Sequence, residues 1–154
     1  MWLRLTLNPI LPKLVSDNRQ LQVMNELVFR NLSEDAKRQI CAWKYGGEYD
    51  LYNLPSYEEM QVRQIGFMNP QREKNYYGFW DESILVGFVN ILEEKEEVFI
   101  GIGVNPDFCN KHYGQRMLLI TYEISKKLYP NKPLYLEVRT WNIRAVKCYQ
   151  KAGF

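Results

Sequence analysis

The sequence predicts an α/β (α+β) fold, a central sheet flanked by helices, on three observations. Residues 134–138 alternate apolar and polar side chains, the period of a strand, and a helical pattern follows them. Residues 97–104, EVFIGIGV, form an apolar run typical of a buried central strand, and an amphipathic helix comes after it. Residues 75–80 and 84–92 have the composition of two strands joined by a short turn.

The first 24 residues form an N-terminal extension whose structure the sequence leaves undefined. Met1 to Val15 is apolar but broken by two prolines, and it has no small-residue cleavage site, so we expect no signal peptide. Met24 is a candidate start of the native protein, which would leave an extension that need not pack. We therefore divide the chain into an extension, residues 1–24, and a domain, residues 25–154.

The domain is predicted to begin with a strand and two capped helices. Residues 26–32, ELVFRNL, are the expected first strand. Ser33 is a favourable N-cap for a helix that reaches Trp43, and acidic residues in its first turn suit the helix dipole. Residues 56–68 are expected to form the second helix, because Ser56 and the glutamate three positions later match a capping box.

The loop between these helices, residues 43–53, is aromatic and carries the carboxylates of Glu48 and Asp50. Two interpretations stay open. The aromatic residues could pack in the core, or the loop could line a site for a cationic amine.

Charge is distributed unevenly along the chain. Residues 111–154 hold nine of the 20 Lys and Arg residues but only two of the 18 Asp and Glu residues. A basic C-terminal third suits an anionic ligand, and an acidic remainder suits a cationic amine. Solvated helix faces explain many of these lysines equally well.

The loop after the predicted central strand is a candidate anion site. Residues 105–114, NPDFCNKHYG, lead into a helix whose apolar face is formed by Met117, Ile120, Ile124 and Leu128. Free backbone N–H groups and the helix dipole point at such a loop. The chain has a single histidine, His112, and no nucleophile motif accompanies it, so a structural role near the helix start is favoured over hydrolase chemistry.

The end of the chain, LYLEVRTWNIRAVKCYQKAGF, holds the most informative pattern. The strand of residues 134–139 is followed by Asn142, a favourable N-cap. Tyr149 lies on the last turn of the helix that follows, and Gly153 ends that helix. A strand that ends beside a helix N-terminus brings polar groups to the carboxyl edge of a sheet, where ligands bind.

This segment resembles the GNAT superfamily of N-acetyltransferases through Leu136, Glu137, Val138, Arg139, Asn142, Ala145, Tyr149, Gly153 and Phe154. Within the superfamily, the spacing is most similar to that of the ribosomal-protein N-terminal alanine acetyltransferases. The resemblance implies a mixed, mostly antiparallel sheet, acetyl-CoA (coenzyme A) as co-substrate and no metal. It also implies that a primary amine, on a protein N-terminus or a small molecule, attacks the thioester directly, with Glu137 as base and Tyr149 as acid.

The same resemblance places the cofactor on the anion site. GNAT enzymes hold the coenzyme A pyrophosphate with a loop of the form Arg/Gln-x-x-Gly-x-Gly/Ala. Here Gly114 matches the last glycine, but Cys109 stands in the first position and His112 replaces the middle glycine. Asn142 is expected to orient the pantetheine arm. The cofactor-binding residues that the resemblance implies are Ile102, Gly103, Val104, Cys109, Asn110, Lys111, His112, Tyr113, Gly114, Gln115 and Asn142.

Each catalytic assignment has a structural alternative. Tyr149 could be an aromatic residue on the core face of its helix, and Glu137 could be a surface residue on a solvated strand. The irregular loop and the apparent lack of the last two strands also leave open a non-catalytic or inactive truncated acyl-CoA-binding module.

GNAT domains normally continue past the Gly-Phe pair with two more strands, whereas this sequence stops at Phe154. We therefore expect a C-terminally truncated fragment, with an open sheet edge and an uncovered apolar surface. Two alternatives remain. A second subunit, as in a homodimer, or the N-terminal extension could cover the gap.

Other classes of function find little support. Cys41, Cys109 and Cys148 have neither zinc-site nor disulfide spacing, and no apolar run is long enough to span a membrane. We therefore predict a cytoplasmic protein without a metal or a membrane partner. The basic C-terminal part leaves nucleic-acid binding as a third interpretation, but no recognised motif supports it, and we expect no nucleic-acid partner.

Overall fold

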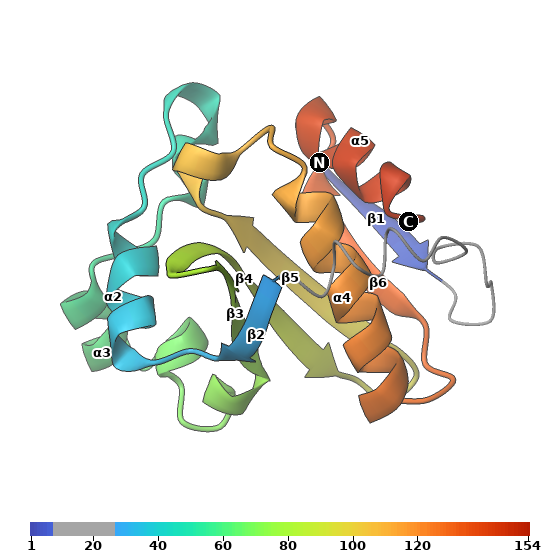
Figure 1. The fold of residues 1–154 in the computed structure, drawn as a ribbon, viewed down its shortest axis with the longest axis horizontal. Coiled ribbons are helices and arrows are strands. Elements are labelled where there is room, and N and C mark those ends of the chain that lie inside the picture. The colour runs from blue at the N-terminus through green and yellow to red at the C-terminus, as the bar shows by residue number, and fades with distance from the viewer. Residues whose placement is uncertain (8–26) are drawn as a thin grey trace.

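A six-stranded sheet in the order β1-β6-β5-β4-β3-β2 carries the fold (Figure 1). The computed structural model describes residues 1–7 and 27–154. All neighbouring strands are antiparallel except β5 and β6, which are parallel. The predicted class, a mixed and mostly antiparallel sheet flanked by helices, is confirmed. The strands are β1 (Trp2–Leu7), β2 (Leu27–Asn31), β3 (Tyr76–Asp81), β4 (Ile84–Glu93), β5 (Val98–Val104) and β6 (Leu134–Arg139).

The helices begin at the predicted caps. Ser33 Oγ accepts a hydrogen bond from the backbone N–H of Ala36 at 3.1 Å, and Ser56 Oγ accepts one from Glu59 at 3.2 Å. The second predicted helix ends earlier than expected, because Gln64 takes a left-handed conformation with φ 51°. The helices are α2 (Glu34–Ala42), η2 (Gly47–Tyr52), α3 (Tyr57–Arg63), η3 (Gly66–Met68), η4 (Glu73–Asn75), η5 (Pro106–Phe108), α4 (Tyr113–Leu128) and α5 (Ile143–Lys151).

Two hydrophobic clusters lie on opposite faces of the sheet. Val89 of β4 belongs to the cluster that packs against α4, whereas its neighbour Phe88 packs against the cluster under α2 and α3. Successive residues of a strand point to opposite faces, so the two clusters are separated by the sheet. The α4 cluster differs from the prediction at one position, since Leu128 is 49% exposed while Met117 is fully buried.

Residues 2–7 of the expected extension form β1, which pairs with β6 along its whole length. Trp2 lies opposite Arg139, and Leu7 lies opposite Leu134. The predicted open edge beside residues 134–139 is therefore wrong in this structure, and the alternative that the N-terminal extension covers this edge is confirmed. The remaining residues of the predicted extension, 8–24, lie outside the described residues.

The signal for β1 was present in the sequence. Leu3, Leu5 and Leu7 alternate with Trp2, Arg4 and Thr6, which is strand periodicity. Side chains on one face of β1 also anchor it to the sheet. Arg4 forms an ion pair with Glu97 and lies 3.9 Å from the ring centre of Tyr135. The expectation that this segment need not pack is thus wrong for residues 2–7, and residues 27–31 are the second strand of the fold.

Gly87 is the most constrained glycine among those that the structure describes. A Cβ atom there would overlap the side chain of Met117 and lie 2.8 Å from the carbonyl oxygen of Gly103. The flexible side chain of Met117 can move away, but the backbone of β5 at Gly103 cannot. We expect Gly87→Ala to lower the free energy of unfolding in urea by about 1–3 kcal/mol, the usual cost of overpacking. Gly46→Ala is the control, because nothing lies within 4 Å of its Cβ position; equal losses in both variants would contradict this packing argument.

Candidate active site

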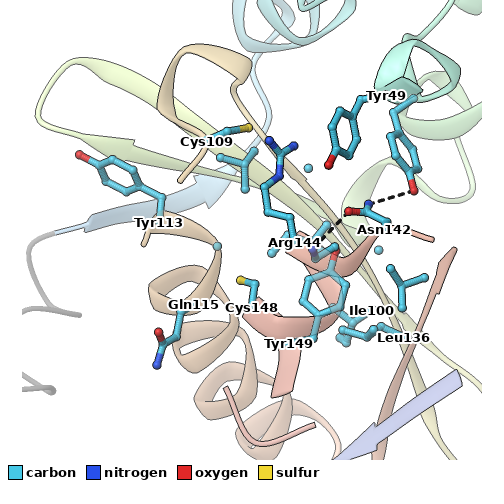
Figure 2. Close-up of a pocket in the computed structure, with 18 of the residues that line it drawn as sticks. Tyr49, Ile100, Cys109, Tyr113, Gln115, Leu136, Asn142, Arg144, Cys148 and Tyr149 are labelled. Carbon is cyan, nitrogen blue, oxygen red and sulfur yellow. Dashed lines mark hydrogen bonds between the residues drawn. The ribbon is translucent and has the colours of Figure 1, made fainter. Parts of the chain in front are cut away.

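β5 and β6 diverge toward their carboxyl ends. Their ladder contains only two pairs, Val98 with Leu134 and Phe99 with Tyr135, whereas β4 stays paired with β5 as far as Val104. Beyond Phe99, the backbone of β5 is therefore not paired with β6. A cavity of about 640 Å³ is lined by this part of β5, by β6, and by residues of α4, α5 and the segment 43–54 (Figure 2).

The N-terminus of α4 opens onto this cavity. Its N-cap, His112, has φ 65° and makes no side-chain capping bond, and Asn110 is also left-handed at φ 62°. The backbone N–H groups of the first turn have no acceptor within the helix, and the positive end of the helix dipole lies beside them. The His112 side chain is exposed. The loop can therefore present backbone donors to an anion even though it lacks the usual middle glycine.

Gly114 lets α4 and α5 approach each other closely. A Cβ atom at this position would lie 3.0 Å from Cys148 Sγ and 3.6 Å from Val104 Cγ2. The contact with Val104 would be an ordinary one, but Cys148 would have to shift by a few tenths of an ångström, so glycine is the residue that fits here without moving α5 side chains.

Ten of the eleven predicted cofactor residues line the cavity, and Lys111 does not. Its ammonium instead lies 5.3 Å from the ring centre of Phe108. The ten that line the cavity are Ile102, Gly103, Val104, Cys109, Asn110, His112, Tyr113, Gly114, Gln115 and Asn142.

Tyr149 lines the cavity from α5, and its ring also packs against the cluster under α4. Both interpretations of this residue are thus compatible. Burial raises the pKa of the Tyr149 phenol well above its ordinary value, and the neighbouring Cys148, Tyr52 and Tyr45 act in the same direction. A raised pKa keeps the phenol protonated at neutral pH, which is the state that a proton donor needs.

Glu137 lines the same cavity from β6. Its side chain is exposed, and in the β1–β6 register it lies opposite Arg4. The structure therefore brings the two predicted catalytic residues to one cavity from different elements. An exposed carboxylate can exchange protons with solvent, directly or through a water molecule.

Asn142 is buried, with 6% of its surface exposed, and its amide is engaged on both sides. Its Oδ1 accepts a hydrogen bond from the backbone N–H of Ala145 at 3.2 Å, and its Nδ2 donates to Tyr52 Oη at 3.2 Å (Figure 2). The residue thus caps α5 and ties η2 to it. One Nδ2 hydrogen remains for a ligand, since the amide carries two.

The sequence left open whether the aromatic residues of 43–53 pack in the core or line a site, and several of them line the cavity. Tyr45 donates a hydrogen bond to the carbonyl oxygen of Val104 at 2.6 Å. Tyr49 packs against Trp141 at 5.7 Å between ring centres. The aromatic composition of residues 43–53 was a signal for both, but no local pattern showed which rings face the cavity. Glu48 and Asp50 of this loop are exposed and are not among the described lining residues.

A basic row on α5 was missed. Arg144, Lys147 and Lys151 all line the cavity, and the Arg144 guanidinium lies 4.2 Å from the ring centre of Tyr49. Their spacing of three and four residues places them on one face of the helix, a pattern that the sequence already contained. This row supplies positive charge next to the α4 N-terminus.

Two cysteines line the cavity without features of activated thiols. Burial raises the pKa of both the Cys109 and the Cys148 thiol, which lowers the thiolate fraction. Among the described residues, no group of three His, Cys, Asp or Glu residues could hold a metal ion. In the same part of the chain, no helix has the length and apolar character needed to cross a membrane.

Comparison with known proteins identifies relatives of this arrangement. The acetyltransferase (GNAT) family model matches residues 32–154. A search of curated proteins found no match. A chimeric form of the spermidine N-acetyltransferase SpeG from Vibrio cholerae has a similar structure, with a TM-score of 0.69 at 20% identity over 83% of this chain and 80% of that chain.

Two further solved structures are similar in fold. A GNAT-family acetyltransferase from Bacillus anthracis gives a TM-score of 0.63 at 16% identity, covering 83% of this chain and 79% of its own. A GNAT-family acetyltransferase from Colwellia psychrerythraea gives 0.65 at 14% identity, covering 99% of this chain and 51% of its own. At these identities the likeness concerns the fold alone.

Proposed function

This chain belongs to the acetyltransferase (GNAT) family, and on that premise we propose that it transfers the acetyl group of acetyl-CoA to a primary amine. One observation carries the proposal. The N-terminus of α4, Tyr149 and Glu137 all border the cavity that opens where β5 and β6 diverge. The acceptor is a primary amine of a small molecule or of a protein N-terminus.

Acetyl-CoA would be held by the α4 N-terminus and by the basic row on α5. The pyrophosphate would accept hydrogen bonds from the backbone N–H groups at the start of α4, where the helix dipole favours negative charge. Arg144, Lys147 and Lys151 would compensate the remaining phosphate charge. Gly114 supports this placement, because a glycine adds no side chain of its own to the first turn of the helix.

The two catalytic roles follow from the chemistry of the transfer. Glu137 would accept a proton from the ammonium group of the acceptor, through a water molecule or directly, and so produce the neutral amine that attacks. The amine nitrogen then forms a bond to the acetyl carbon, and the bond from that carbon to sulfur breaks. Tyr149 would donate its proton to the leaving thiolate. The nitrogen loses its second proton as the amide forms, and that proton would reprotonate Tyr149 directly or through solvent. The spacing of Glu137 and Tyr149, which resembles that of the ribosomal-protein N-terminal alanine acetyltransferases, supports these roles.

Direct attack by the amine is favoured over an acetyl-cysteine intermediate, because the two cavity thiols have raised pKa values. We expect the protein to remain unmodified when incubated with acetyl-CoA in the absence of an amine. Intact-protein mass spectrometry tests this directly. Stoichiometric acetylation of Cys109 or Cys148, followed by its loss when amine is added, would contradict direct attack.

The cofactor site is tested by titration calorimetry beside a thermal melt. Acetyl-CoA at 100 times its dissociation constant should stabilise the folded chain by about 2.7 kcal/mol and raise its Tm. Gly114→Ala should weaken binding by about tenfold, since its Cβ forces the Cys148 side chain to shift beside the first turn of α4. Adding Cys148→Ala to that variant should restore affinity by making room. If acetyl-CoA leaves the Tm of the wild-type chain unchanged, the proposed cofactor site is wrong.

A non-catalytic acyl-CoA-binding module is the alternative, and the irregular loop at Cys109 and His112 is the observation that favours it. The apparent lack of the last two strands is the other argument for it, and the edge beside β6 that they would leave open is paired with β1. The alternative predicts acetyl-CoA binding without any turnover, so measurable transfer to an amine would exclude it.

A further inference from the structure

The cavity has an aromatic end on the face of the sheet that lies away from α4. Trp43, Leu54 and Phe88 line it and pack against the cluster under α2 and α3, whereas the α4 residues belong to the opposite face. Tyr45, Tyr49 and Tyr52 complete this end. The opening between β5 and β6 joins the two faces, so a thioester that enters from the α4 side would meet its acceptor here.

The aromatic walls are fixed by contacts with the rest of the protein. Trp43 and Phe88 have ring centres 6.1 Å apart, and Tyr45 is hydrogen-bonded to the end of β5. Tyr49 packs against Trp141, and Tyr52 bonds to Asn142 by the hydrogen bond drawn in Figure 2. Residues 45–52 therefore connect β5 with the start of α5, and they form a wall over the site. Such a wall suits a compact acceptor better than an extended peptide chain.

The charges around the cavity exclude a second ammonium group. Among the described residues that line it, Glu137 is the only carboxylate, and the proposed reaction already uses it. The other described Lys, Arg, Asp and Glu residues that line the cavity are all cations, namely Arg144, Lys147 and Lys151. A second ammonium on the acceptor would lose its water without gaining a counter-ion, which is strongly unfavourable. An apolar or aromatic group in the same place would pack against rings.

We propose that the acceptor is a small monoamine whose amino group is attached to an apolar or aromatic body, and that polyamines are poor substrates. This inference rests on the proposed acetyl transfer and specifies its substrate class. The reacting ammonium itself is compatible with aromatic walls, because ring faces attract a single cation until Glu137 removes its proton.

A matched pair of amines tests the inference. 4-Phenylbutylamine and 1,4-diaminobutane share a four-carbon chain and differ only in the distal group, a phenyl ring or an ammonium. At saturating acetyl-CoA, kcat/KM should be at least about 100-fold higher for 4-phenylbutylamine than for 1,4-diaminobutane or spermidine, as expected for an unpaired charge in the site. Equal or higher kcat/KM for either polyamine would overturn the substrate class while leaving acetyl transfer intact. A tetrapeptide that begins with alanine and has the highest kcat/KM of all these acceptors would also overturn the substrate class while leaving acetyl transfer intact.

The same assay distinguishes a failure of the proposed acetyl transfer from a failure of the proposed substrate class. If the chain binds no acetyl-CoA and acetylates none of these amines, both the transfer and its substrate class are wrong. If it binds acetyl-CoA and transfers to the diamine preferentially, only the substrate class is wrong.

Two leucine variants test whether the aromatic end of the cavity determines the preference for a monoamine over a diamine. Leu54 lines the aromatic end, whereas Leu51, on η2, is 48% exposed and is not among the described lining residues. Leu54→Glu supplies the missing carboxylate, so the ratio of kcat/KM for diamine over monoamine should rise by about tenfold, as expected for one new charge pair. Leu51→Glu adds the same charge outside the cavity and should leave the ratio unchanged. Equal changes in both variants would overturn the assignment of the aromatic end. Melting curves establish that both variants are folded, and the wild-type amine ratio decides the substrate class if Leu54→Glu does not fold.

Discussion

Replacing Tyr149 with phenylalanine should lower kcat by a factor on the order of 100, at the low end of the effect of a general acid. The change removes the hydroxyl group but keeps the ring, which packs against the cluster under α4. The fold and the affinity for acetyl-CoA should therefore stay close to those of the wild-type chain. Burial raises the pKa of this phenol, so its ionisation should not limit the wild-type rate at any pH up to about 10, the ordinary value for tyrosine.

The control for this variant is Tyr129→Phe. Tyr129 follows α4 and is not among the described residues that line the cavity, so its hydroxyl should not affect turnover. Steady-state rates and calorimetric titrations with acetyl-CoA separate the two possible roles of Tyr149. If Tyr149→Phe keeps the wild-type kcat, Tyr149 is a packing residue and another group donates the proton.

Glu137→Gln should lower kcat/KM for the amine by about 100-fold at neutral pH, because the ammonium form then lacks its base. The deficit should shrink as the pH approaches the pKa of the amine itself, about 10.4 for a lysine-like group, since more of the substrate is then already neutral. If Glu137 had only a structural role, the kcat/KM of Glu137→Gln would not recover at high pH.

Glu96→Gln is the matched change for this experiment. Glu96 is exposed, as Glu137 is, but it lies in the turn before β5 and not among the described lining residues. Both variants lose one negative charge, so a general electrostatic effect on the cationic substrate would appear in both. A constant deficit of Glu137→Gln across the pH range would argue against the base role.

The parts of the fold with strong local signals could be predicted from the sequence. Ser33, Ser56 and Asn142 all cap helices as expected, because a polar N-cap acts within a few residues of itself. The apolar run of β5 and the alternation of β6 likewise led to the correct strands. The end of α3 was missed, since the left-handed turn at Gln64 carries neither glycine nor proline as a signal.

Contacts between distant segments were harder to predict. β1 pairs with β6 across most of the chain, and nothing in Trp2–Leu7 specifies that partner. The alternation of its leucines indicated a strand, but the prolines that follow directed the interpretation toward an unpacked extension. Because the sequence stops where GNAT domains continue with two more strands, we predicted an open edge at β6, where the structure has a paired strand.

The candidate site shows the same division. Glu137, Asn142 and Tyr149 were predicted as site residues from the resemblance of one short segment to the GNAT family. Tyr45 and Phe88 reach the cavity only through the fold, one by a hydrogen bond to the end of β5 and the other from the middle of β4. Aromatic residues are common in cores, so their sequence context cannot distinguish a cavity wall from ordinary packing.

The most direct test of the proposed transfer is the release of free coenzyme A by the wild-type chain, followed with a thiol reagent while 4-phenylbutylamine is varied at saturating acetyl-CoA. The account predicts release that rises with amine concentration and saturates, with one acetylated amine formed for each thiol released. Tight acetyl-CoA binding with thiol release that does not depend on this or any other primary amine would contradict it.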